Sequence, residues 1–97
     1  MIRVTSLVWI WKGGEGSGRW YFITIPEEES NEIRAHAFGN PRGFRSVRVE
    51  ATIDDVTWQT SVFPLNSGGY LLPLKAEVRR KANLGAGDEV TVELHLL

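Results

Sequence analysis

Two cations in the C-terminal third of the chain have the spacing of an anion-binding pair. Lys75 and Arg79 stand four residues apart in the segment 73–83, which the sequence predicts to be helical, so both side chains are expected on one helix face. Arginine holds a phosphate or carboxylate through two parallel hydrogen bonds, whereas lysine acts as a point charge. The pair therefore indicates a site for an anionic ligand. The alternative is a solvated helix face whose charges bind nothing.

Aromatic residues with polar tips accompany these cations. The set comprises Trp9, Trp11, Trp20, Tyr21, Trp58 and Tyr70. A subset could line a pocket in which Lys75 or Arg79 supplies the polar group. A place in the core is the alternative for each ring, because small barrels are filled by their own side chains. Together with a hydroxyl on the strand of Trp58, the candidate ligand-binding residues are Trp58, Thr60, Tyr70, Lys75 and Arg79.

A second hypothesis is a nucleic-acid surface. The only basic run is Arg79, Arg80 and Lys81, and three arginines nearby in the sequence, between residues 42 and 48, could join it. The candidate residues are Arg42, Arg45, Arg48, Arg79, Arg80 and Lys81. Successive helix residues diverge around the helix axis, and the formal net charge of the chain is −1. Both facts argue against a focused basic patch, so we expect nucleic acid as the alternative partner and a small molecule as the first.

No motif in the sequence has the pattern of a catalytic or metal site. The chain has no cysteine, and its two imidazoles, His36 and His95, lack the spacing of zinc ligands. The acidic run 27–29 would diverge on a helix. Ser61 has no nucleophile elbow around it, and the glycines of 13–18 do not form a phosphate loop. We therefore predict no catalytic residue, metal or cofactor, and an enzyme of undetected type is the third hypothesis.

Length and composition are those of one folded domain. The chain has 97 residues, of which 42% are hydrophobic and 10% aromatic, as in a globular protein. No apolar run reaches the roughly 18 residues that a membrane span needs, and the N-terminal residues do not resemble a secretion signal. With no disulfide possible, the expectation is a soluble cytoplasmic domain over residues 1–97, without a membrane partner, as a monomer or homodimer.

Alternating apolar residues predict an all-β fold. Strands are expected over 2–12, 19–25, 46–53, 56–63, 70–72 and 89–97, with short helices over 26–37 and 73–83. Tight turns join most of these strands, including Asp54-Asp55, and Gly85 and Gly87 are expected to end the second helix. Six short strands in a small domain favour a closed barrel, because closure removes exposed edges.

The first predicted strand is apolar on both faces. Leu7, Trp9 and Trp11 alternate with Val8 and Ile10. A strand with apolar side chains on both sides is typical of one that is covered on both sides. We therefore expect the rest of the domain to cover both faces of residues 2–12.

Several segments resemble a bacterial family known only as a domain of unknown function. They are GRWYFITIP at 18–26, WQTSVFP at 58–64, GGYLLPLKAEVR at 68–79 and GAGDEVTV at 85–92. The resemblance covers nearly the whole chain. It implies a double-split β-barrel, and it implies no catalytic activity.

The same resemblance extends distantly to the AbrB and MazE transcription regulators, which share that barrel. This part covers only residues 72–92, with a proline, a helix and Gly-Asp-x-Val. Those regulators are intertwined dimers that bind DNA through basic residues. Here a single chain has enough strands to close a barrel by itself, which departs from the dimeric architecture of those regulators.

Overall fold

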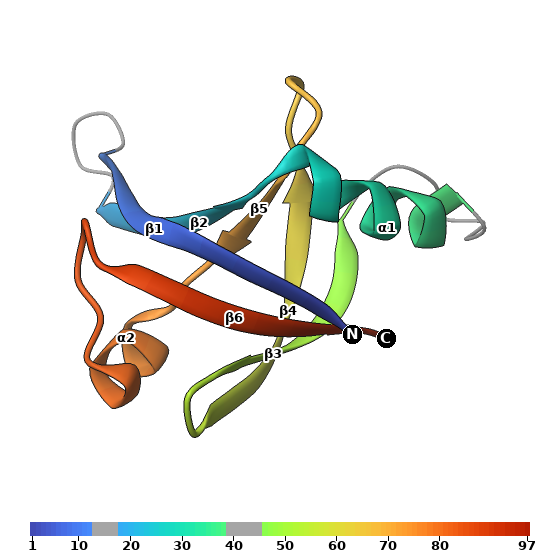
Figure 1. Ribbon diagram of the computed structural model, residues 1–97. Helices are drawn as coiled ribbons and strands as arrows, with labels where there is room; N and C mark the ends of the chain where they lie inside the picture. Colours follow the sequence, from blue (N-terminus) through green and yellow to red (C-terminus); the bar gives the residue numbers. More distant parts are fainter. Residues whose placement is uncertain (13–17, 39–45) are drawn as a thin grey trace.

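The computed structural model describes residues 1–12, 18–38 and 46–97, and within these ranges the chain forms six strands and two helices (Figure 1). Their bounds are β1 (Ile2–Lys12), β2 (Arg19–Ile25), α1 (Glu27–Phe38), β3 (Val47–Ile53), β4 (Val56–Pro64), β5 (Tyr70–Pro73), α2 (Ala76–Ala82) and β6 (Glu89–Leu96). The strands close into a barrel in the order β1-β2-β5-β4-β3-β6. All neighbouring strands are antiparallel. The predicted closed six-stranded barrel with two short helices is therefore confirmed.

Single strands change partner along their length, which lets a small number of strands close the barrel. Residues 2–7 of β1 pair with β6, whereas residues 8–12 pair with β2. β2 in turn passes from β1 to β5, with Phe22 and Ile23 pairing on both sides. Each such change bends the sheet, because strands that leave one partner for the next must cross the barrel at an angle.

The barrel interior is filled by the side chains that the alternation predicts. Along β3 the residues Val47, Val49, Ala51 and Ile53 are buried, and the residues between them are not. On β6 the buried residues are Val90, Val92 and Leu94, and the residues between them are not buried. Burial of such side chains is the main stabilising contribution in a domain of this size.

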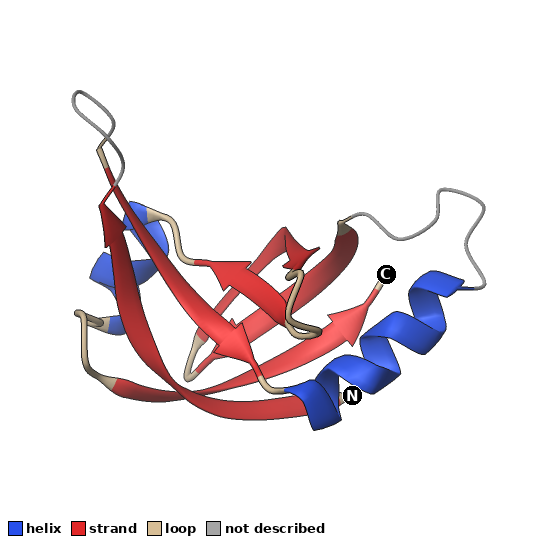
Figure 2. Cartoon of the chain, turned by 90° about the horizontal axis from the view of Figure 1, so that it is seen from above, coloured by secondary structure: helices blue, strands red, loops and turns tan. Residues whose placement is uncertain are grey.

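The helices lie at opposite ends of the barrel (Figures 1 and 2). α1 begins directly after Pro26 and buries Ile33 and Ala37, while the buried Ser30 Oγ donates a hydrogen bond of 3.0 Å to the carbonyl oxygen of Ile25. The predicted helix over 26–37 is confirmed to within a residue. Neither helix in the described ranges has the length and apolar content that a membrane-crossing helix requires.

The expectation that β1 is covered on both faces is wrong. Leu7 and Trp11 are 55% and 51% exposed, while Val8 on the other face is buried. In a closed barrel one face of every strand points into the interior and the other points outward. The helices pack at the ends of this barrel, so the outer face of β1 remains open.

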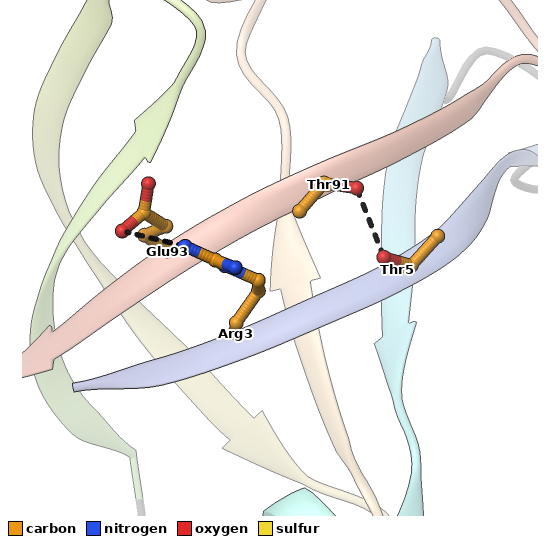
Figure 3. Close-up of polar contacts among 4 residues, drawn as sticks. All are labelled: Arg3, Thr5, Thr91 and Glu93. Atoms are coloured by element: carbon orange, nitrogen blue, oxygen red, sulfur yellow. Dashed lines mark hydrogen bonds and ion pairs between the residues drawn. The ribbon is translucent and has the colours of Figure 1, made fainter.

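The outer surface of β1 changes character where the strand changes partner. Beside β6 it is polar: Arg3 Nη2 lies 3.9 Å from Glu93 Oε2, and the hydroxyls of Thr5 and Thr91 are 2.9 Å apart (Figure 3). Beside β2 it is aromatic, because Trp9 pairs with Phe22 and Trp11 with Trp20. The barrel thus has one hydrophilic wall and one wall with exposed aromatic rings.

The second helix is shorter than predicted. β5 continues to Pro73, and α2 begins only at Ala76, because Lys75 has the extended angles φ −71° and ψ 159°. At the other end Asn83, with φ 56° and ψ 53°, takes the left-handed conformation that ends the helix. Gly85 and Gly87 were expected in that role and instead lie in the turn before β6. Asparagine tolerates this conformation better than other non-glycine residues.

The turn between β3 and β4 follows the prediction. Asp54 and Asp55 connect the last residue pair of the hairpin, Ile53 and Val56. Asp54 has φ 51°, a conformation that two-residue hairpin turns require at their first position and usually fill with glycine or asparagine. Aspartate substitutes there because its short polar side chain tolerates this backbone geometry.

Candidate functional site

The site is built where the barrel wall splits between β2 and β4. β5 pairs with β4 only through Tyr70 and Leu71, although it continues beside β2 as far as Pro73. Residues 56–62 of β4 pair with β3, and residues 19–21 of β2 pair with β1, without a described strand between them. Backbone groups on such strand edges are available to other partners. The connection into α2 crosses this opening.

A cavity of about 270 Å³ occupies the split. Its walls come from β2, β4, the end of β5 and the start of α2. The described lining residues are Arg19, Trp20, Tyr21, Trp58, Gln59, Thr60, Pro73, Leu74, Lys75, Ala76 and Arg79. The backbone N–H of Leu74 donates a 2.8 Å hydrogen bond to the carbonyl oxygen of Tyr21. This bond fixes the α2 connection against β2, so the cavity has a defined wall on that side.

Arg79 is held in place by two contacts. Its guanidinium carbon lies 3.6 Å from the centroid of the Tyr21 ring, a cation–π arrangement. Its Nε donates a 3.2 Å hydrogen bond to the carbonyl oxygen of Leu74. The two Nη atoms donate to no residue in the described ranges. A guanidinium whose orientation is fixed and whose fork remains available is suited to holding a carboxylate or phosphate bidentately.

Arg79, Lys75 and Arg19 are the cations around the cavity, and no carboxylate is among the described lining residues. Lys75 and Arg19 are exposed, and neither forms an ion pair with a described carboxylate. The whole chain carries 12 acidic and 11 basic residues. Three cations around one cavity, without an acid among its described lining residues, therefore represent a local separation of charge that favours an anion there.

Aromatic rings also line the cavity. Trp58 is 8% exposed and belongs to the buried core, yet it also lines the cavity. Tyr21 is half-buried beneath Arg79, and Trp20 is exposed at the rim. Rings with flat faces and fixed positions give such a cavity a preference for planar apolar groups.

Four of the five residues predicted as ligand-binding line this cavity. They are Trp58, Thr60, Lys75 and Arg79. Tyr70 is not among the described lining residues: it is buried at the opposite end of β5, where it pairs with Ile25 and Pro64. Tyr70 follows the turn that leads into β5, whereas the cavity begins only where β5 ends.

The prediction that Lys75 and Arg79 share one helix face is wrong in its geometry. Lys75 precedes α2 in extended conformation, and only Arg79 belongs to the helix. The two still line the same cavity, because the helix starts at its rim. Sequence reasoning missed Arg19 as a lining residue, and it named Trp20 and Tyr21 only within the wider aromatic set. The pairing of β2 with β5 brings them there, and no local pattern in the sequence signals that pairing.

The residues of the nucleic-acid hypothesis are only partly described. Arg42 and Arg45 lie outside the described residues. Arg48 is on the outer face of β3, where its Nη1 donates a 3.3 Å hydrogen bond to Ser61 Oγ. Arg80 and Lys81 are exposed on α2, and Lys81 Nζ lies 2.9 Å from Glu77 Oε1. The hypothesis stays a prediction at this point.

One carboxylate stands near the cavity without lining it. The pKa of Glu77 is lowered from its ordinary value of 4.5. The main cause is Lys81, which donates a hydrogen bond to the carboxylate and adds its positive charge, and the charge of Lys75 acts in the same direction. Glu77 is on α2, two residues beyond Lys75. It therefore remains ionised at neutral pH and partly offsets the positive charge at the rim of the cavity.

The arrangement contains no recognisable catalytic unit within the described ranges. Ser61 Oγ accepts its hydrogen bond from Arg48, whereas His36 Nε2 lies 3.3 Å from the carbonyl oxygen of Leu97. Neither His36 nor His95 lines the cavity. No group of three or more His, Cys, Asp or Glu side chains in the described ranges gathers closely enough to hold a metal ion. The site can bind and orient a ligand through charge, hydrogen bonds and ring contacts.

Comparison with protein families matches residues 5–94 to the family described as Domain of unknown function (DUF1905). The chain belongs to this family. The match confirms the resemblance to a domain of unknown function that was stated from the sequence. Comparison with curated proteins gave no match. The cavity and its three cations lie within the DUF1905 match, so the site is part of the family domain itself.

Proposed function

We propose that this DUF1905 chain is a non-enzymatic binding module whose cavity takes a small ligand with an anionic group beside a planar apolar part. The observation that carries the proposal is a cavity lined by three cations, without a described carboxylate, together with three aromatic rings. The cations are Arg19, Lys75 and Arg79, and the rings are those of Trp20, Tyr21 and Trp58. Cavities that bind small molecules generally combine apolar walls with a few convergent polar groups. This cavity has both.

The residues divide the work of binding between them. Arg79, fixed by Tyr21 and Leu74, offers its two Nη atoms to the anion. Lys75, at the rim, adds a mobile charge. Trp58 and Tyr21 contact the planar part. The volume of about 270 Å³ is slightly below the range of roughly 300–1,000 Å³ that is usual for ligand pockets, which supports a ligand no larger than a substituted aromatic acid or an aromatic phosphate.

We also propose that the protein is located in the cytoplasm of a bacterial cell and that it is a monomer or a homodimer. The absence of cysteine supports a reducing compartment. The bacterial source is supported by the resemblance described above.

Titration with phenyl phosphate, followed by NMR chemical shifts of a ¹⁵N-labelled chain, tests the proposed function. Phenol, which lacks the anionic group, serves as the matched neutral ligand. We expect phenyl phosphate to shift the resonances of residues 19–21, 58–60 and 74–79, including the indole N–H of Trp20 and Trp58. Phenol is expected to bind at least tenfold more weakly, which corresponds to about 1.4 kcal/mol.

Two variants with the same change of net charge locate the binding. Lys75→Gln removes a cation from the cavity rim, whereas Arg80→Gln removes one from an exposed position of the same helix that does not line the cavity. We expect about tenfold weaker binding for Lys75→Gln, the loss of roughly one charge-assisted contact, and less than twofold for Arg80→Gln. Equal effects of the two substitutions would contradict the proposed site.

A further inference from the structure

A second hollow lies on the outer surface of the barrel and adjoins the cavity. Its volume is about 600 Å³, and its described lining residues are Trp20, Phe22, Arg48, Thr60, Ser61, Phe63, Leu71 and Pro73. Trp20, Thr60 and Pro73 line both hollows. The groove therefore continues the cavity across the face of β2, β5 and β4, and the two form one binding track with Trp20 in the middle.

Aromatic rings are exposed along this track, and Phe22 among them is held by a neighbouring ring. Trp20 and Phe63 are 54% and 45% exposed. The centroid of the Phe22 ring lies 5.2 Å from that of Trp9, with 36° between the ring planes. The indole Nε1 of Trp9 in turn donates a 2.9 Å hydrogen bond to Thr24 Oγ1. A ring supported in this way loses little freedom when a planar group stacks on it.

Cations stand at both ends of the track, and no carboxylate is among its described lining residues. Arg48 lies at the groove end, while Arg19, Lys75 and Arg79 lie around the cavity. The opposite wall of the barrel, beside β6, has paired charges and hydroxyls instead (Figure 3). The track thus combines cations with ring faces, and its complement is a chain that carries both anions and planar rings.

We infer that the track binds single-stranded nucleic acid, with phosphates at the four cations and bases stacked on Trp20, Phe22 and Phe63. For the cavity half, the inference rests on the function proposed above. Single strands present their base faces to aromatic side chains, with a backbone that follows a positively charged groove. A duplex keeps its bases stacked on one another and offers no such faces. An acidic peptide would match the cations and leave the three rings without planar partners.

Fluorescence anisotropy with a fluorescein-labelled oligothymidylate of twelve nucleotides tests the inference. Each phosphate neutralised on a single strand contributes a slope of about −0.7 to log Kobs against log salt. Four cations therefore predict a slope of about −3. Trp20→Ala is expected to weaken binding at least about fivefold, because a stacked base is lost. Circular dichroism confirms that this variant, altered at an exposed ring, is folded.

A matched pair of arginine substitutions separates the track from general charge. Arg48→Gln removes the cation at the groove end, and Arg3→Gln removes one from the polar wall. Arg48→Gln should make the salt slope shallower by about 0.7, and Arg3→Gln should leave it unchanged. Equal effects of both substitutions, or equal binding of a twelve-base-pair duplex, overturn the inference.

Competition distinguishes a track from a site for one nucleotide. Thymidine monophosphate has only one phosphate and one base, so it lacks the gain that linked contacts give an oligonucleotide. It should displace the labelled oligonucleotide only at a concentration about a hundredfold or more above that of unlabelled oligonucleotide. Displacement at equal concentration overturns the extended track. If the oligonucleotide does not bind while phenyl phosphate still binds through Lys75, the inference fails and the proposed function stands. If phenyl phosphate does not bind either, both fail.

Discussion

The guanidinium carbon of Arg79 lies 3.6 Å from the centroid of the Tyr21 ring, which joins α2 to β2 across the split in the barrel wall. The contact links the position of the cation to a residue of the barrel itself. Arg79 also donates through Nε to Leu74, in the connection that precedes the helix. The guanidinium at the cavity is thus oriented by two separate elements before any ligand arrives.

Arg79→Lys should separate charge from orientation. Lysine keeps the positive charge but has neither the planar group that lies flat on Tyr21 nor the Nε that contacts Leu74. We expect phenyl phosphate to bind about tenfold more weakly, and the free energy of unfolding to fall by about 1 kcal/mol. NMR titration and urea denaturation measure the two effects. Unchanged affinity in the lysine variant would show that charge alone suffices at this position.

Gly69→Ala should destabilise the barrel near α1. A Cβ at Gly69 would lie 2.8 Å from the carbonyl oxygen of Ile25, the same atom that accepts the hydrogen bond of Ser30. Backbone must move to relieve this overlap, at a cost of about 1–3 kcal/mol. At Gly18 a Cβ would have no described atom within 4 Å, so Gly18→Ala should change stability by less than about 0.5 kcal/mol. Urea denaturation of the two variants compares them, and equal stabilities would contradict the close approach.

Asn83 should respond to substitution according to its left-handed backbone. Its φ of 56° strongly disfavours β-branched side chains, so Asn83→Val is expected to cost about 1–2 kcal/mol. Asn83→Gly should be at least as stable as the parent chain, because glycine is the residue most often found at this position of a helix end. Thermal unfolding monitored by circular dichroism ranks the three proteins. A valine variant as stable as the glycine variant is the result that this backbone conformation excludes.

Glu77 should make part of the stability of α2 dependent on pH. Its pKa is lowered in the folded chain, first by the hydrogen bond from Lys81, then by the charges of Lys81 and Lys75. A lowered folded-state pKa means that the contribution is complete above the ordinary value of 4.5 and is lost as the pH falls through the lowered value. Melting temperatures measured from pH 6 to pH 3 should therefore fall less for Glu77→Gln than for the parent. Lys81→Gln should reduce the same pH-dependent loss, since it removes the main cause of the shift.

The strands were predictable because each has one face in the barrel interior. β3 and β6 alternate buried and exposed residues along most of their length, and that alternation depends only on local sequence. The outer face was not predictable in this way. Trp11 and Trp20 carry large apolar rings, as core residues do, yet they are exposed. Composition alone does not distinguish a ring that fills a barrel from one that covers its surface.

The candidate site was predictable only where its residues are close in sequence. Trp58 and Thr60 are two residues apart on β4. Lys75 and Arg79 are four residues apart at the start of α2. Arg19, Trp20 and Tyr21 join them through strand pairing over about fifty residues of sequence, which no local pattern encodes. The start of α2 was misplaced for a related reason. Pro73 suits the first turn of a helix, but its pairing with Phe22 extends β5 instead.

The pairing of β1 with β6 joins residues 2–7 to residues 89–94. During synthesis, β1 can pair with β2 early, but the edge facing β6 has no partner until residue 94 has been made. Until then, the β1 edge that pairs with β6 stays unpaired, and the apolar side chains of the barrel interior stay partly exposed to solvent. Refolding of the full chain should for the same reason belong to the millisecond-to-second class typical of folds dominated by distant contacts. Pairing of β6 is therefore the step that closes the barrel. A nascent chain that stops before β6 would leave the edges of β1 and β3 open to association with other chains.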